Sequence, residues 1–206
     1  MLIFSMVIPV VVLATLHSFP LPDNPRASHE VSTDLRAIVE AAMSSRASPV
    51  RVVLGENPNE VRRQLVGLSV EKIYNPHWEE GMVSSVHAGL KGLKKQVDLL
   101  SGVLLIQANG TAVSPKHLNR LIDAFKYMRA DVVETFTEKG GSLPVLFHRD
   151  MLEKILELPA DRPFSLVELG NDQKKISLPV QLDEGAEKFP FKDLGQYLRN
   201  MWRLAI

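Results

Sequence analysis

The stretch Asn75–Leu90, NPHWEEGMVSSVHAGL, stands between a short extended segment and an apolar pattern with helical spacing. Asn75-Pro76 is a turn signal, because proline fixes φ and disfavours the helical conformation in the residue before it. After Gly81, Val86 and Leu90 recur at the spacing of one helix face. The stretch therefore predicts a strand end, a tight turn and a helix with a polar first turn, and this is where we expect a ligand to bind.

Apolar runs typical of buried strands alternate with helical patterns along nearly the whole chain. The expected strands are Val7–Ala14, Val50–Leu54, Glu71–Tyr74, Val103–Gln107, Asp131–Phe136, Val145–Phe147 and Ile176–Leu182. Four helices are expected with defined bounds: Asn59–Leu65, Arg149–Leu158, Phe164–Gly170 and Lys192–Leu204. Three more are expected: a first helix capped by Ser32 or Thr33 that runs through Met43, a helix that contains Val86 and Leu93, and a helix that starts at Pro115. This order predicts a three-layer α/β fold with a mostly parallel central sheet, whose ligands bind at the carboxyl ends of the strands.

Length and composition suit one globular domain over residues 1–206, since 45% of the residues are apolar and 23% are charged. Lysine plus arginine and aspartate plus glutamate both total 24, so the basic surface of a nucleic-acid-binding protein is not expected. The chain has no cysteine. This excludes disulfides, thiolate metal sites and cysteine nucleophiles, and it favours a cytoplasmic location.

The opening segment, MLIFSMVIPVVVLATL, is the part of the sequence that most resembles a membrane or signal segment. No lysine or arginine precedes Arg26, so the cationic start of a signal peptide is missing. A run of about 16 residues is also shorter than the roughly 20 that span a bilayer. We therefore expect no membrane segment and interpret Val7–Ala14 as a buried first strand.

The turn and helix start after Asn75 place exposed amides and hydroxyls at the positive end of a helix dipole, which suits oxygen-rich or base-edge acceptors. The expected ligand contacts there are Asn75, Gly81, Met82, Ser84 and Ser85. A purely structural interpretation is also open, in which Ser84 caps the helix and Gly81 permits the turn.

Three motifs extend this pattern: NPxWxxGMxSSxxAGL at Asn75–Leu90, VVLG at Val52–Gly55 and VSPxHLxxLIxAF at Val113–Phe125. Together they resemble the MobA-like nucleotidyltransferases, especially the molybdenum-cofactor cytidylyltransferase branch. The resemblance spans roughly residues 7 to 198 and implies a three-layer, Rossmann-like nucleotidyltransferase fold. It also implies transfer of a nucleotide from CTP or GTP to a pterin-type acceptor, molybdopterin, with Mg²⁺ and release of pyrophosphate.

The family's glycine-rich phosphate loop, LAAGxSxRxGxxK, is altered in this chain. Leu13, Ala14 and Ser18 match it, and Ser18 is a further expected ligand contact. Leu16 and Pro22 replace glycines, Pro20 replaces the arginine, and Pro25 falls at the lysine position. Glycines let the backbone approach the phosphates, whereas proline has no amide to donate, so this loop is not expected to form the usual anion cradle.

The positions that correspond to the family's two metal-binding aspartates are also altered. Asn109 stands at the first and Phe189 at the second. The expected metal site is therefore missing, with Glu187 and Asp193 as weak nearby candidates, while Asn109 remains an expected ligand contact. Because Mg²⁺ requires hard oxygen ligands and the transferred group requires charge neutralisation, these losses predict an impaired catalyst.

The sequence thus predicts a MobA-like protein that retains nucleotide or pterin-type binding at most. One alternative is an active CTP- or GTP-dependent nucleotidyltransferase with a relocated metal site. That site would draw on Asp161, Asp183, Glu187 or Asp193, with phosphates met by Arg26, Lys91 or Arg162. Another alternative is a non-catalytic interaction protein, for which the sequence shows no interface.

Overall fold

The computed structural model describes residues 6–14, 35–108, 113–137, 140–161, 164 and 174–179, and every structural statement below concerns these residues. The expected helix Lys192–Leu204 lies outside them, as do the expected helix 164–170 after its first residue and the end of the last strand after residue 179. The capping position at Ser32 or Thr33 also lies outside.

Seven strands of the described chain form one sheet in the order β3-β2-β1-β4-β6-β5-β7. Their bounds are β1 Val10–Ala14, β2 Val50–Leu54, β3 Glu71–Tyr74, β4 Gly102–Gln107, β5 Val132–Thr137, β6 Gly140–His148 and β7 Lys175–Pro179. The pairs β1–β2, β1–β4, β2–β3 and β5–β7 are parallel, whereas β6 is antiparallel to both β4 and β5. The prediction of a mostly parallel sheet is confirmed.

Two of the strands with fully described bounds, β1 and β6, differ from the prediction by more than one residue. β1 begins at Val10, and Val7 and Ile8 form only isolated bridges, because Pro9 between them and the strand has no N–H for the ladder. β6 covers nine residues rather than the expected Val145–Phe147, and its register with β5 shifts between Glu134 and Thr135. A run containing two glycines and a proline carries little strand signal, so pairing with β5 defines this strand better than its own composition does.

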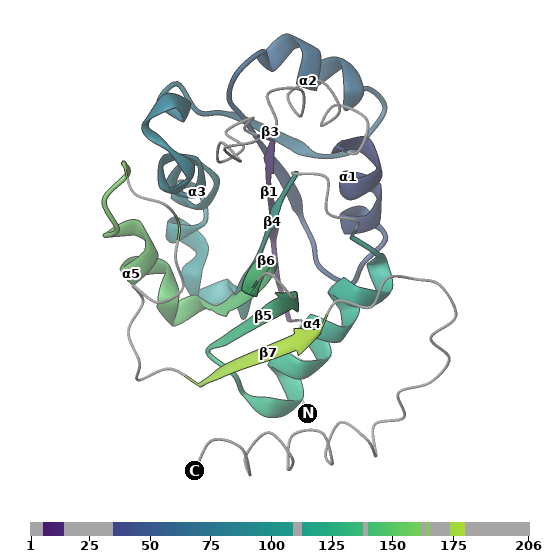
Figure 1. The fold of residues 1–206 in the computed structure, drawn as a ribbon, viewed down its shortest axis with the longest axis vertical. Coiled ribbons are helices and arrows are strands. Elements are labelled where there is room, and N and C mark those ends of the chain that lie inside the picture. The colour runs from purple at the N-terminus through teal and green to yellow at the C-terminus, as the bar shows by residue number, and fades with distance from the viewer. Residues whose placement is uncertain are drawn as a thin grey trace.

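Helices cover both faces of the sheet (Figure 1). The helices of the described chain are α1 Leu35–Met43, α2 Pro58–Gln64, α3 Met82–Lys91, α4 Pro115–Met128 and α5 Leu152–Leu156, with short 3₁₀ turns η2 Trp78–Glu80, η3 Lys94–Leu99 and η4 Arg149–Met151. Residues of α1, α2 and α4 share one core cluster with one face of the sheet, and residues of α3 and α5 share a second cluster with the other face. Three layers result, as expected. None of the helices in the described ranges is long and apolar enough to cross a bilayer.

The start of α4 shows how sequence signals position an element. The Ser114 hydroxyl accepts a hydrogen bond from the His117 amide at 3.1 Å, and Pro115 occupies the first turn, where its missing amide costs nothing. The helix ends at Arg129, which adopts the left-handed conformation with φ 48°. The prediction that Pro115 begins a helix is confirmed.

The order of strands defines where an α/β protein of this type binds ligands. The chain passes from β1 to β2 on one side of β1, and it returns through α3 to β4 on the other side. Ligands bind outside the carboxyl ends of strands at such a switch point. Here that position follows Ala14 and Ala108, and the residues after each, 15–34 and 109–112, lie outside the described ranges.

Helix α3 packs close to the sheet and is fixed by the buried side chain of Arg51. A Cβ on Gly89 would lie 2.4 Å from Cγ1 of Val11, so only glycine permits this approach. The Arg51 guanidinium, from β2, donates to the Gly89 carbonyl and to both carboxylate oxygens of Glu71 on β3, at 2.7 and 3.0 Å. Arg51 therefore joins β2, β3 and α3 at one point.

Candidate functional site

Asn75, directly after β3, lies at the centre of a buried hydrogen-bond network. Its side-chain amide donates to the hydroxyls of Ser84 and Ser85, at 3.0 and 3.1 Å, and its carbonyl oxygen accepts from the His77 amide at 3.0 Å. The Ser84 hydroxyl donates in turn to the carbonyls of His77 and Gly81, at 2.7 and 2.8 Å. These side chains fix the turn between β3 and α3, and their donors already have partners inside the protein.

The start of α3 leaves its first backbone amides available. The N-cap residue is Gly81, which has no side chain to cap them, and the structure gives α3 no side-chain cap. The first amides of a helix have no partner within the helix, and they lie at the positive end of its dipole. Of the purely structural interpretation, the cap by Ser84 is wrong, since the Ser84 hydroxyl donates to carbonyls, whereas Gly81 does permit the turn through its positive φ.

Gly81 itself adopts φ 132° and ψ −172°, a conformation reserved for glycine. Substituting alanine is expected to cost about 1 kcal/mol or slightly more in the free energy of unfolding, because the new Cβ strains the backbone. Urea unfolding followed by circular dichroism measures this. The matched control is Glu80→Ala, whose exposed carboxylate pairs with His77 at 3.1 Å. Equal stability of the two variants would contradict the assigned strain.

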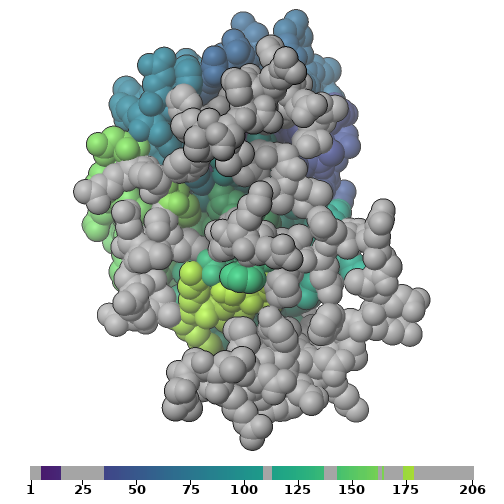
Figure 2. Space-filling view, viewed as in Figure 1, coloured from purple at the N-terminus to yellow at the C-terminus, as the bar shows by residue number. Residues whose placement is uncertain are grey.

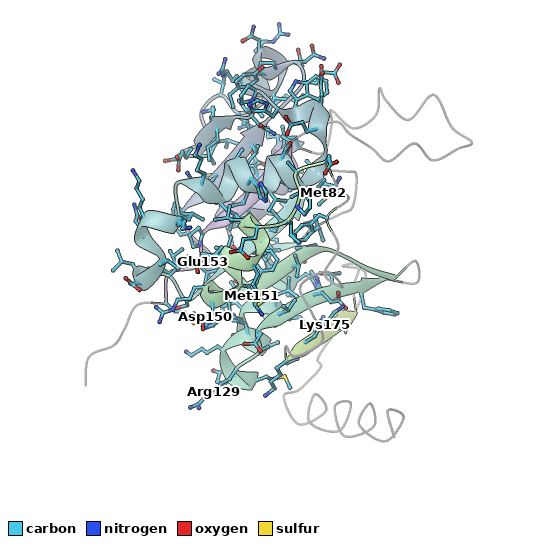
Figure 3. The ribbon with its side chains drawn as sticks, turned by 90° about the vertical axis from the view of Figure 1, so that its left-hand side faces the viewer. Met82, Arg129, Asp150, Met151, Glu153 and Lys175 are labelled. Carbon is cyan, nitrogen blue, oxygen red and sulfur yellow. The ribbon has the colours of Figure 1, made fainter. Side chains whose placement is uncertain are left out.

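The remaining expected site residues fall in different places. Met82 begins α3 and is half-buried against the core on that face, as Figure 3 shows at the start of the helix. Lys91 lies at the far end of α3, exposed, away from the carboxyl ends of the strands. Asp161 is exposed after α5. The other expected contacts and metal candidates lie outside the described residues: Ser18, Arg26, Asn109, Arg162, Asp183, Glu187 and Asp193.

A metal centre does not form within the described ranges, which hold no group of three or more histidine, aspartate or glutamate side chains that could bind an ion. One buried carboxylate there, Glu134 of β5, is engaged by two residues of β7. It accepts from the Ser177 hydroxyl at 2.6 Å and pairs with the Lys175 ammonium at 3.0 Å. The sequence pattern did not single out this cluster, because its three residues are far apart along the chain.

A groove along the outer side of α3 was also missed by sequence reasoning. It has a volume of about 640 Å³ and lies between the turn after β3 and the end of α5. Figure 2 shows α3 and α5 together on one flank of the molecule, and Figure 3 turns that flank toward the viewer. The residues on its helix wall are Ser84, His87, Ala88 and Lys91, spaced as one helix face. That spacing is visible in the sequence, but the pairing of α3 with α5 is not.

Comparisons with known proteins were made for the whole chain. The family model of the MobA-like NTP transferase domain matches residues 29–173. No curated protein matches the chain.

Several solved structures share the fold. Rv0371c from Mycobacterium tuberculosis H37Rv is 19% identical with a TM-score of 0.63, over 94% of this chain and 99% of that chain, and it has also been solved with manganese. CMP:2-keto-3-deoxy-manno-octonic acid synthetase complexed with CTP is 10% identical with a TM-score of 0.58, over 97% and 100% of the two chains. Molybdopterin-guanine dinucleotide biosynthesis protein A from Archaeoglobus fulgidus is 14% identical with a TM-score of 0.53, over 94% and 89%. At these identities the likeness concerns the fold.

Proposed function

Because the chain belongs to the MobA-like NTP transferase domain family, we propose that it is a single-domain relative that binds a nucleotide or pterin-type small molecule without the metal-dependent transfer. The observation that carries the proposal is a contrast between two parts of one pocket. The turn between β3 and α3 holds a buried hydrogen-bond network, with Asn75 3% exposed. In the segment after β1, by contrast, Leu16 and Pro22 replace the family's glycines, and Pro20 and Pro25 replace its arginine and lysine.

Ligand recognition is assigned to the start of α3. The backbone amides of the first turn of α3, starting at Met82, offer donors to a base edge or another oxygen-rich group at the positive end of the helix, whereas the Gly81 amide already donates to the Trp78 carbonyl. Asn75, Ser84 and Ser85 act through the turn, because their hydrogen bonds hold those amides in place. Ser18 and Asn109 are proposed to contact the same ligand from the loops after β1 and β4. CTP and GTP are the proposed nucleotides.

The residues at the family's metal positions do not fit Mg²⁺. Asn109 contributes a neutral oxygen, and Phe189 contributes none. Mg²⁺ requires several hard oxygen ligands in octahedral geometry, and triphosphate binding also requires donors that the prolines of the altered loop lack. We therefore assign no transfer step to this chain. A cytoplasmic location is proposed from the absence of cysteine.

The test is a thermal-shift series with CTP, GTP and ATP, each with and without MgCl₂. Binding without metal is expected to raise the Tm with CTP or GTP, and a ligand at ten times its Kd stabilises a protein by about 1.4 kcal/mol. The rise should be weaker in Gly81→Ala, which distorts the proposed donors, and unchanged in Glu80→Ala.

Two results would reject the proposal. A rise that requires Mg²⁺, together with pyrophosphate release from CTP or GTP on addition of molybdopterin, would indicate an active transferase with a relocated metal site. No rise with any of the three nucleotides, with or without metal, would favour the interaction-protein alternative.

A further inference from the structure

The groove on the outer face of α3 begins at the turn after β3 and extends along the helix to Lys91. The side of α3 that faces the sheet carries Val86, Gly89 and Leu90, which are buried against the core. The groove lies on the opposite side of the helix, and its volume of about 640 Å³ is within the range of small-molecule sites, roughly 300–1,000 Å³. Its lining residues are Ile73, Tyr74, Asn75, Pro76, His77, Glu80, Ser84, His87, Ala88, Lys91, Leu156 and Ala160.

At one end of the groove, the polar groups have partners within the protein. Ser84 and Asn75 are bonded to each other and to the turn, and both side chains are buried. The Glu80 carboxylate lies 3.1 Å from Nδ1 of His77. At this end, therefore, most polar side chains already have hydrogen-bond partners within the protein, and the Glu80 carboxylate is in contact with His77.

The other end of the groove carries the positive charge of Lys91, which has no carboxylate partner among the described residues. Among the described residues, no carboxylate lies within ion-pair distance of the Lys91 ammonium. One turn earlier, Nε2 of His87 lies 2.9 Å from the Ile155 carbonyl, which can only accept, so Nε2 carries the proton that it donates. In the neutral ring this leaves Nδ1 as an acceptor. The two side chains are four residues apart and thus neighbours on one helix face.

Apolar groups join the two ends. Ala88 lines the groove from α3, and Leu156 and Ala160 line it from the end of α5 and the residues after it. Ile73 and Tyr74 line it from β3, and Tyr74 is 48% exposed. A ligand that fills this groove needs an apolar or aromatic body and an anionic group at one end.

We propose that the groove on the outer face of α3 binds a small aromatic or apolar acid, with its carboxylate or phosphate at Lys91 and its body between Tyr74 and Leu156. The groove shares Asn75 and Ser84 with the turn of the proposed nucleotide site, but the anionic group is assigned to Lys91, so this proposal does not rest on the proposed function. A charge-assisted contact with Lys91 selects anions, and the apolar walls exclude inorganic phosphate as the main ligand.

Chemical-shift perturbation with ¹⁵N-labelled protein tests the site, using benzoate and phenyl phosphate as acids and benzyl alcohol as the neutral analogue. Saturable shifts of the Ala88, Lys91 and Ala160 amides are expected for at least one acid at concentrations up to about 10 mM, and not for the alcohol. Lys91→Met should weaken binding roughly two- to fivefold, which is the range for an exposed ion pair. The control is Lys95→Met, an exposed lysine that does not line the groove, for which no change is expected.

Comparing benzoate with phenyl phosphate shows whether the groove prefers a carboxylate or a phosphate. The proposal is overturned if neither acid produces saturable shifts at these amides, if benzyl alcohol binds as well as the acids, or if Lys91→Met and Lys95→Met behave alike. Because the assay contains no nucleotide, a failure here leaves the proposed nucleotide site unaffected.

Discussion

Replacing Asn75 by alanine is expected to lower the free energy of unfolding by about 2–4 kcal/mol, the largest effect of a single substitution that we predict. The change removes two donated hydrogen bonds and one accepted hydrogen bond. It also leaves the Ser84 and Ser85 hydroxyls without their buried partner, and an unsatisfied buried group costs more than the lost bond itself contributes. Urea unfolding at neutral pH measures the effect.

Two further variants identify which part of the Asn75 amide matters. Asn75→Asp keeps an oxygen for the His77 amide but cannot donate to the two serines, so it is expected to remain destabilised at neutral pH. Asn59→Ala is the control, because Asn59 is exposed on α2 and accepts only a 3.4 Å contact from Arg62. If Asn75→Ala were as stable as Asn59→Ala, the network would not be what holds the turn.

Replacing Glu71 by glutamine is expected to destabilise the protein by about 1–2 kcal/mol at pH 7. The Arg51 side chain is only 7% exposed, and removing its charged partner leaves a buried cation. Breaking a buried pair in this way costs about 3–5 kcal/mol, but the Glu71 side chain is 55% exposed and solvent screens the pair, so a smaller cost is expected. The double variant Arg51→Met/Glu71→Gln should recover part of the loss, because it also removes the buried charge.

The effect of Glu71 should depend on pH in a defined direction. The hydrogen bond from Arg51 holds the pKa of the Glu71 carboxyl below its ordinary value of 4.5, and burial opposes this less strongly. A carboxyl whose pKa is lower in the folded state stabilises the fold fully above its unfolded pKa. That contribution is lost as the pH falls through the folded pKa. The stability difference between the native protein and Glu71→Gln should therefore be constant from pH 7 to about pH 5 and shrink below pH 4.5. A difference that grows on acidification would contradict the pairing.

The sequence predicted the strands of the sheet well where a turn signal marks their ends. Val50–Leu54 and Glu71–Tyr74 were expected with the observed bounds, because Gly55 and the Asn75-Pro76 turn end them. The length of β6 was wrong, since its first half owes its conformation to pairing with β5 rather than to its own residues.

The sequence predicted that the residues around Asn75 lie together, but not how they bond, and their contact with a ligand stays a prediction. Asn75, Ser84 and Ser85 were expected to face a ligand, and they do converge, yet they bond to one another. A sequence shows which polar groups lie close together, but not whether they satisfy one another. Contacts between distant segments could not be inferred either: Arg51 had the pattern of a strand residue, and only the fold brings Gly89 and Glu71 to it.

The hydrogen bonds of Arg51 to Gly89 and Glu71 have a consequence for how this protein could change over evolution. Arg51 holds β2, β3 and α3 together through hydrogen bonds to Gly89 and Glu71, which lie in α3 and β3. The turn at Asn75 is thus held by β2, β3 and α3. Its backbone shape does not require the loops after β1 and β4 to keep a particular sequence. The family's glycines, two cations and carboxylate could be replaced in those segments while the neighbouring turn kept its geometry. The backbone of one part of such a fold can in this way be conserved in shape while the sequence of an adjoining segment diverges.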